Sequence, residues 1–349
     1  MLIFEAILTD ACFFKNFVPL IIQILKIYHN DEAPESVWES FYELSEKNSI
    51  VNQLNPNIDY YTNKYFIYKC IFYNQWSSIF IYANDLKILH SECTFTRCKN
   101  TKGGAIYMQG NSSIVQHRYC AASCMSSEDG IYSYVNLVSA SKLNYNIEGS
   151  LSQNTGNQNT NYIHNGQMAL SFMNFSKNYA ESCSAFNVEQ VIGNINYSNI
   201  EGNYANSNYV ISIFPILCNI NYCNVLENYC ERNTDGIIYC QGTVIFENCS
   251  FLRNGNKTLI YYRTYIYYNI TISNSYYDEL TLSENNNINQ NNNQQANILN
   301  ELVFFVNFEC NTQMNIQKQN KCYCSPGDSI SYPFLRMFVY SMPTLYKIK

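Results

Sequence analysis

The chain has 349 residues and a formal net charge of −6, and only 14% of its residues are charged. Such a mildly acidic chain has no basic surplus to attract nucleic acid, so no nucleic-acid partner is expected. Its 32 tyrosines and 20 phenylalanines, together with conspicuous asparagine runs, favour strands and turns over helices.

Residues 1–64 are expected to form an irregular, partly helical N-terminal region. Within 31–47, apolar residues such as Val37, Trp38 and Phe41 are spaced as in an amphipathic helix. This helix is a candidate cap for the open end of a strand stack, because terminal units of repeat arrays need a different outer face.

The apolar segment 13–27 is short and is interrupted by two lysines and a proline. It predicts neither a signal peptide nor a membrane span, and no transmembrane segment is expected in the chain. Six glycosylation acceptor sequences nevertheless favour an extracellular or cell-surface location. They begin at Asn111, Asn174, Asn196, Asn248, Asn256 and Asn269.

Residues 65–280 contain a repeat of about 25 residues. Each unit holds three short β-capable pieces, for example 243–246, 249–251 and 259–261, with Gly or Asn at the joins and no helical stretch. This pattern predicts an all-β fold, a single-stranded right-handed parallel β-helix of eight or nine turns.

One unit, between Cys124 and Asn178, has drifted beyond easy recognition. The segment Asn146–Gly149 falls where its motif is expected, about 27 residues from the neighbouring copies. The polar run Gln153–Asn161 that follows is interpreted as a loop extruded from that unit.

In a parallel β-helix each side chain stacks on its equivalents about 4.8 Å above and below. The repeat therefore predicts an interior apolar column and an asparagine ladder in a turn, where amides bond one another and the backbone. The apolar column comprises Phe95, Phe175, Ile200, Val225 and Phe251. The ladder comprises Asn178, Asn203, Asn228 and Asn254, with Cys98 and Cys124 in the same column of earlier turns.

The 15 cysteines show no zinc-finger spacing, and neither a metal nor a cofactor is predicted. Three pairs fall on adjacent turns of the predicted coil and admit three interpretations: buried thiols, disulfides or redox sites. Buried free thiols are the default among these. The pairs are Cys70 and Cys93, Cys98 and Cys124, and Cys223 and Cys249.

A family resemblance rests on Gly103-Gly104-Ala105-Ile106 and on Phe-x-x-Asn at 175–178 and 251–254. These segments resemble the GGA[ILV] and FxxN repeats of polymorphic outer-membrane proteins, and of large surface-protein families of parasitic protists. The resemblance covers roughly 66–278 and implies a pectate-lyase-like β-helix. It also implies a non-enzymatic, adhesin-like surface or secreted protein that binds glycans or host-cell-surface proteins.

Four tyrosines recur at the end of the third strand of a unit and form a candidate binding face, since aromatic columns often grip sugars or partner chains. The alternative is plain packing of aromatic rings. The four are Tyr107, Tyr132, Tyr239 and Tyr261.

Asp235 is the one weak catalytic candidate. The segment 233–236, Asn-Thr-Asp-Gly, resembles that of polygalacturonase-type glycoside hydrolases, in which this Asp acts with an Asp-Asp pair one turn later. Here that position reads Asn254-Gly255-Asn256-Lys257, and no Asp-Asp occurs in the chain. The alternative function is thus a degenerate or active polysaccharide hydrolase or lyase with Asp235 as its remnant, and the competing interpretation is a turn residue before glycine.

The remaining C-terminal residues divide into two parts. Residues 281–300 are rich in Asn and Gln and are predicted to be a linker. Residues 301–349 are predicted to be a cysteine-containing tail.

Overall fold

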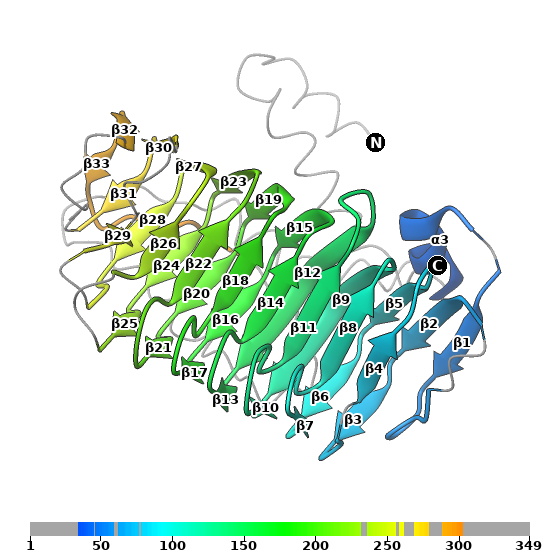
Figure 1. Ribbon diagram of the computed structural model, residues 1–349. Helices are drawn as coiled ribbons and strands as arrows, with labels where there is room; N and C mark the ends of the chain where they lie inside the picture. The colour runs from blue at the N-terminus through cyan, green and yellow to red at the C-terminus, as the bar shows by residue number, and fades with distance from the viewer. Residues whose placement is uncertain are drawn as a thin grey trace, which may run out of the picture. The chain divides into compact units, whose positions relative to one another are not determined.

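The computed structural model describes residues 34–44, 46–58, 62–76, 78–231, 236–255, 258–261, 269–278 and 288–302, all within the compact unit Met1–Thr312. They form a parallel β-solenoid of about 8 turns (Figure 1). This is the right-handed β-helix-like fold that the repeat predicts. In the described part, no helix is long and apolar enough to cross a membrane.

Three parallel sheets, here called A, B and C, make up the coil. Sheet A contains β1 (Asn48–Val51), β2 (Lys64–Tyr68), β3 (Ile71–Tyr73), β5 (Lys87–Ser91), β6 (Thr94–Thr96), β9 (Ser113–Ala122), β12 (Leu143–Ser152), β15 (Gln167–Ser171), β16 (Asn174–Ser176), β19 (Ile192–Asn196), β20 (Asn199–Glu201), β23 (Leu217–Asn221), β24 (Asn224–Leu226), β27 (Thr243–Glu247), β28 (Ser250–Leu252), β30 (Ile270–Ser273), β31 (Tyr276–Tyr277), β32 (Ile288–Asn291) and β33 (Gln294–Gln295). Sheet B contains β7 (Lys99–Asn100), β10 (Met125–Ser126), β13 (Thr155–Gly156), β17 (Tyr179–Ala180), β21 (Tyr204–Ala205) and β25 (Tyr229–Cys230). Sheet C contains β4 (Ile79–Tyr82), β8 (Ile106–Gly110), β11 (Ser133–Leu137), β14 (Asn161–His164), β18 (Phe186–Glu189), β22 (Ile211–Phe214), β26 (Ile238–Cys240) and β29 (Ile260–Tyr261).

The interior apolar column lies in sheet A. Strand register aligns Phe95 with Ala121, and then Leu151 with Phe175 on later turns. The column continues through Ile200, Val225 and Phe251, and all five residues predicted for it are buried. Burying each large apolar side chain contributes roughly 1.5–3 kcal/mol to folding.

The asparagine ladder follows that column at the turn into sheet B. The Nδ2 of Asn178 donates to the Oδ1 of Asn203 at 2.9 Å, and Asn228 bonds Asn254 in the same way at 3.1 Å. Each Nδ2 also donates to a backbone carbonyl, that of Leu151 in the case of Asn178. The residue before each of these asparagines has positive φ: Lys177, Gly202, Glu227 and Arg253.

The drifted unit differs from the prediction. Its motif does not lie at Asn146–Gly149: the ladder residue of the unit is Asn154, whose Nδ2 donates to the Oδ1 of Asn178 at 2.9 Å. The run Gln153–Asn161 is therefore not an extruded loop, since it contains Asn154 and all of β13. The extra length lies earlier, because five residues separate β11 from β12 where two separate β8 from β9.

The coil is longer than predicted at both ends. Strand β1 lies within the region assigned to the N-terminal cap and pairs with β2. Strands β32 and β33 lie within the predicted Asn/Gln-rich linker and pair with β30 and β31. Asn293, which lies between β32 and β33, helps to hold this last turn in place. Its Nδ2 donates to the carbonyl of Ile272, in β30, at 3.0 Å.

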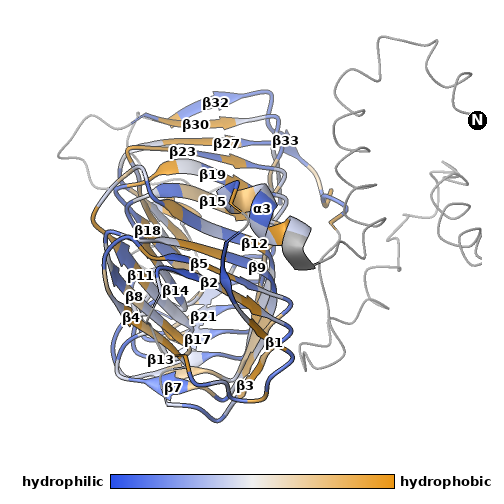
Figure 2. Cartoon of the chain, turned by 90° about the vertical axis from the view of Figure 1, so that its right-hand side faces the viewer, coloured by the Kyte–Doolittle hydropathy of each residue, from blue (hydrophilic) through white to orange (hydrophobic). Residues whose placement is uncertain are grey.

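The predicted helix is present as α3 (Pro34–Tyr42). It packs on the outer side of sheet A, where Trp38 is buried against Phe66, Leu89 and Val115 (Figure 2). The hydroxyl of Tyr42 also donates to the carbonyl of Ile88 at 2.7 Å. Within the described chain the helix thus covers the side of the first turns, and β1 forms the edge of the stack.

Candidate binding face

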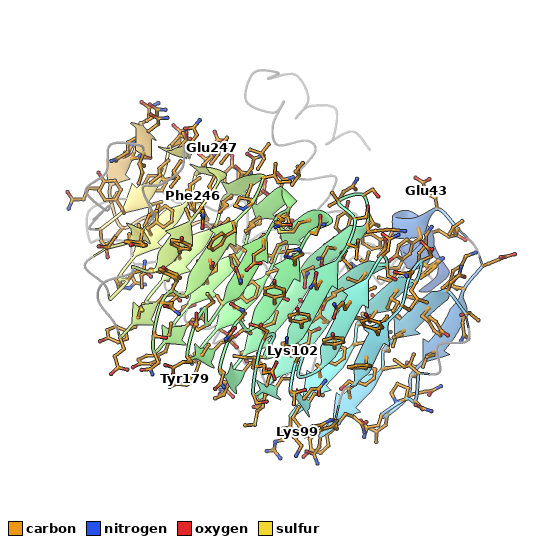
Figure 3. All side chains as sticks on the ribbon, in the orientation of Figure 1. Glu43, Lys99, Lys102, Tyr179, Phe246 and Glu247 are labelled. Carbon is orange, nitrogen blue, oxygen red and sulfur yellow. The ribbon has the colours of Figure 1, made fainter. Side chains whose placement is uncertain are left out.

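The outward side of sheet C carries a column of stacked aromatic rings. The centroids of Phe80 and Tyr107 lie 4.7 Å apart, those of Tyr107 and Tyr134 5.4 Å, and those of Tyr134 and Tyr162 4.7 Å. The ring planes are within 12° of parallel. Parallel strand register produces this column, because equivalent residues of successive turns lie directly above one another. Figure 3 draws the side chains of the described residues as sticks on the ribbon.

Two polar residues interrupt the column. Tyr162 is in register with Asn187, and Asn187 with Ser212. Aromatic residues then return at Tyr239, which is in register with Ser212. We call Asn187, Glu189 and Ser212 the polar break.

A second outward column runs beside the rings and holds their hydroxyl groups. Tyr107 donates from its hydroxyl to the Oε1 of Gln109 at 2.5 Å. The hydroxyl of Tyr239 donates to the Oε1 of Gln241 at 3.1 Å. These two hydrogen bonds restrict the rotation of the rings of Tyr107 and Tyr239.

Glu189 is the centre of hydrogen bonding in the polar break. Its Oε2 accepts from the hydroxyl of Tyr162 at 3.0 Å and lies 3.4 Å from the Nδ1 of His164. Its Oε1 accepts from the Nδ2 of Asn187 at 2.8 Å. The carboxylate is partly exposed, so it can still accept hydrogen bonds from a ligand.

Charged groups flank the break at the turn that leads into sheet C. Burial raises the pKa of the Asp129 carboxyl, and the charge of Glu189 adds to that rise, while a hydrogen bond from the Nδ2 of Asn159 opposes it. The Nζ of Lys102 lies 5.3 Å from the ring centroid of Tyr134. The region therefore presents mainly hydrogen-bond acceptors beside aromatic rings.

The faces of most rings in the column are already occupied. Tyr134, for example, has Tyr107 on one side and Tyr162 on the other. Tyr162 is different because the residue in register on its far side is Asn187. At the polar break, therefore, the ring of Tyr162 has no aromatic residue in register on one side. The carboxylate of Glu189 lies next to this ring.

Three of the four tyrosines predicted for a binding face do share this column. Tyr107 is in register with Tyr134, and Tyr239 with Tyr261. Tyr132 does not belong to it: its side chain is fully buried inside the coil, where it stacks on Tyr119 at 5.4 Å. Tyr132 precedes β11, and the register of that strand places Tyr134, not Tyr132, beside Tyr107.

Tyr134, Tyr162 and Glu189 were not predicted from the sequence. Tyr134 lies two residues after Tyr132, and period-2 alternation would place both on one face; only the start of β11 at Ser133 separates them. Tyr162 lies on β14, which follows the motif of the unrecognised unit. Glu189 lies on β18, and no glycine precedes that strand to mark it in the sequence.

The predicted glycosylation sites fall in different environments. Asn174 is fully buried and its Nδ2 donates to the Oγ of Ser150 at 3.2 Å, so the folded chain does not offer it for modification. Asn269 is exposed. Asn111, Asn196 and Asn248 are partly exposed. Asn256, like the weak catalytic candidate Asp235, lies outside the described residues.

The cysteines of all three predicted pairs are buried and free. Among the residues that the structure describes, no group of three or more His, Cys, Asp and Glu side chains is placed to hold a metal ion.

Comparisons with protein-family models, curated proteins and solved structures found no match to this chain.

Proposed function

We propose that the chain is a non-enzymatic binding protein, of the adhesin-like surface or secreted kind, that binds a glycan along the outer face of sheet C. The polar break carries the proposal. There the ring of Tyr162 lacks an aromatic register neighbour on one side, and the Glu189 carboxylate lies within hydrogen-bonding distance of its hydroxyl.

The chemistry of the break suits a ligand with many hydroxyl groups. A sugar ring places its C–H groups against an aromatic face, while its hydroxyls donate to carboxylate and amide oxygens. Glu189 and Asn187 supply such oxygens, and the rows of Gln109 and Gln241 continue polar groups along the same face. A protein partner would need a larger apolar surface than this partly buried strip offers.

Binding to a panel of immobilised glycans tests the proposal directly. Tyr162→Ala should weaken binding of the glycan that the parent protein selects by at least about tenfold, equivalent to about 1.4 kcal/mol. The matched control is Tyr197→Ala, which removes a ring stacked between Phe172 and Tyr222 (5.1 and 5.2 Å) outside sheet C. Equal losses in the two variants, or no glycan binding by the parent, would refute the proposal.

The enzymatic alternative is tested with the same purified protein. Incubation with polyuronides and other plant polysaccharides should produce no cleavage. Turnover that disappears in Asp235→Asn would replace the binding proposal with a hydrolase or lyase. Turnover unaffected by that substitution would exclude Asp235 as its site.

A further inference from the structure

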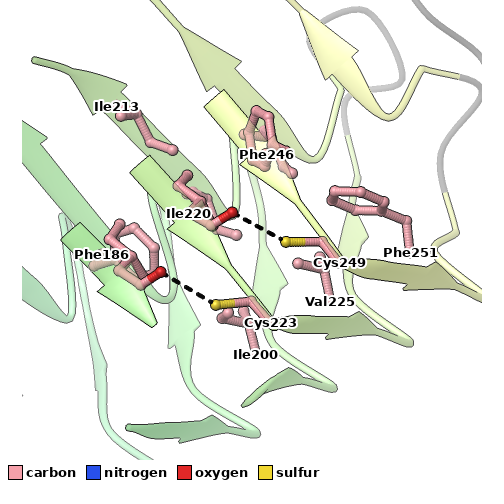
Figure 4. A pocket seen from close by; sticks show the side chains of 12 residues that line it. Phe186, Ile200, Ile213, Ile220, Cys223, Val225, Phe246, Cys249 and Phe251 are labelled. Atoms are coloured by element: carbon pink, nitrogen blue, oxygen red, sulfur yellow. Dashed lines mark hydrogen bonds between the residues drawn. The ribbon is translucent and has the colours of Figure 1, made fainter. Parts of the chain in front are cut away.

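Two buried thiols from adjacent turns lie side by side in the second half of the coil. The neighbouring residues Asn224 and Ser250 are in register, which places Cys223 directly beneath Cys249. Both side chains are fully buried, and both thiols are free. Figure 4 shows the two sulfur atoms on successive turns at the same small cavity.

The cavity between these turns is apolar. Its volume is about 10 Å³, and besides the two thiols it is lined by side chains such as Ile200, Val225 and Phe246. The thiol of Cys223 is directed at the carbonyl of Ile195 (3.6 Å), and that of Cys249 at the carbonyl of Ile220 (3.3 Å). Sulfur is therefore the side-chain ligand atom that the cavity offers, and no carboxylate or amide side chain lines it to favour a hard cation.

The spacing of the coil matches a bridged pair of sulfurs. A metal–sulfur bond is about 2.3 Å long, so a linear sulfur–metal–sulfur unit spans about 4.6 Å. Equivalent residues on adjacent strands are about 4.8 Å apart. The backbones of two stacked cysteines are thus separated by nearly the length that a two-coordinate cation requires between its sulfur ligands.

We propose that Cys223 and Cys249 form a two-coordinate site for a soft monovalent cation of the Cu(I) type. Binding converts the two thiols to one thiolate and one thiol and releases one proton, with no change in oxidation state. The product is neutral, which matters because an unpaired charge in a dry interior is strongly disfavoured. Thiolate is the protein ligand that selects Cu(I).

Two other pairs share the arrangement. Cys70 is stacked with Cys93, and Cys98 with Cys124, through the register of the strands that follow them. Each of these four thiols is also buried and free. Their recurrence on adjacent turns extends the proposal to these pairs, while the cavity makes Cys223 and Cys249 the pair to test first.

Silver(I), which binds sulfur without redox chemistry, is the probe. The reduced full-length chain is refolded with Ag(I), dialysed, and analysed for silver bound per chain. Cys223→Ser and Cys249→Ser should each bind one equivalent fewer than the parent, and the double variant should also bind only one fewer. Serine is a conservative replacement, because Ser198 and Ser275 occupy the same column on the flanking turns.

Cys183→Ser is the matched control, since Cys183 is buried and free but lies in the turn before sheet C. It should bind as many equivalents as the parent. A double variant that loses two equivalents would show independent thiols and overturn the proposal, as would single variants that lose none.

X-ray absorption of a Cu(I)-loaded sample should find two sulfur neighbours at about 2.3 Å. A disulfide between Cys223 and Cys249 in the refolded, metal-exposed chain would also overturn it.

Discussion

The Oδ1 of Asn228 accepts two hydrogen bonds from Asn203, one from its Nδ2 and one from its backbone N–H, both at 3.1 Å. Asn203 in turn receives the same pair of bonds from Asn178. Each ladder residue therefore satisfies backbone and side-chain groups on two turns at once. Loss of one residue affects three turns of the coil.

Asn203→Ala should lower the free energy of unfolding by about 1–3 kcal/mol, because it removes the acceptor of two buried hydrogen bonds from Asn178 and one donor to the carbonyl of Phe175. Urea denaturation measures the change. Asn194→Ala is the control, since this asparagine is exposed and accepts one bond from Asn219 at 3.2 Å. A similar change in both variants would contradict a special role for the ladder.

The repeat contains most of the information about the fold. The 25-residue spacing of Asn178, Asn203 and Asn228 was sufficient to predict their common column, because equal spacing in a parallel coil means equal height. Asn154 could not be found in that way, since a longer connection before β12 displaces it. The regular units were therefore predictable and the irregular unit was not.

The binding face was less predictable than the fold. Tyr107 and Tyr239 were predicted from their recurrence at the end of the third strand, and so was Tyr132, although its side chain lies inside the coil. Its neighbourhood explains the difference: the hydroxyl of Tyr132 donates to the Oε1 of buried Gln116 at 3.0 Å, so a polar side chain inside the coil accommodates it. Hydrophobic patterning alone does not reveal such a partner.

The thiols should be protected from alkylation in the folded chain. Burial raises the pKa of the Cys218 thiol to about 12, so little thiolate is present at pH 8. A hydrogen bond from the thiol of Cys93 lowers the pKa of Cys70 to about 7, but Cys70 is fully buried like Cys218, so iodoacetamide should reach neither thiol. Peptide mapping after brief exposure to iodoacetamide should find both residues at least tenfold less labelled than in the unfolded chain.

Denaturant provides the control for that experiment, since all thiols should react at similar rates once the chain is unfolded. Labelling of Cys70 or Cys218 in the native protein at the rate seen in denaturant would contradict the prediction.

Gly149 should not tolerate even a methyl group. A Cβ at this position would lie 2.6 Å from ring atoms of Tyr119 and 2.7 Å from the Cε of Met173. Gly149→Ala should therefore destabilise the fold by about 1–3 kcal/mol, measured by urea denaturation. Gly202→Asn is the comparison, because its Cβ would meet only Lys177, at 3.7 Å, and Asn tolerates the positive φ of 63°. A larger loss in Gly202→Asn would refute the packing argument.

His90 should make the coil sensitive to acid. Burial lowers the pKa of its imidazole to about 3, against a reference value of about 6.5 in the unfolded chain. Below pH 6.5 the unfolded chain therefore binds a proton that the folded chain does not. Stability should fall as the pH decreases from 6.5 towards 3, and this contribution is constant above that range.

His90→Gln removes the titrating imidazole and places a polar amide next to Gln116, the residue in register on the following turn. Between pH 7 and pH 4.5 the parent should lose roughly 2–3 kcal/mol more of its unfolding free energy than the variant, since each unit of pKa difference corresponds to about 1.4 kcal/mol. Urea titrations at the two pH values measure the difference. The carboxylates and His117 titrate in both proteins and cancel in the comparison, so identical pH profiles would mean that His90 is protonated in the folded coil.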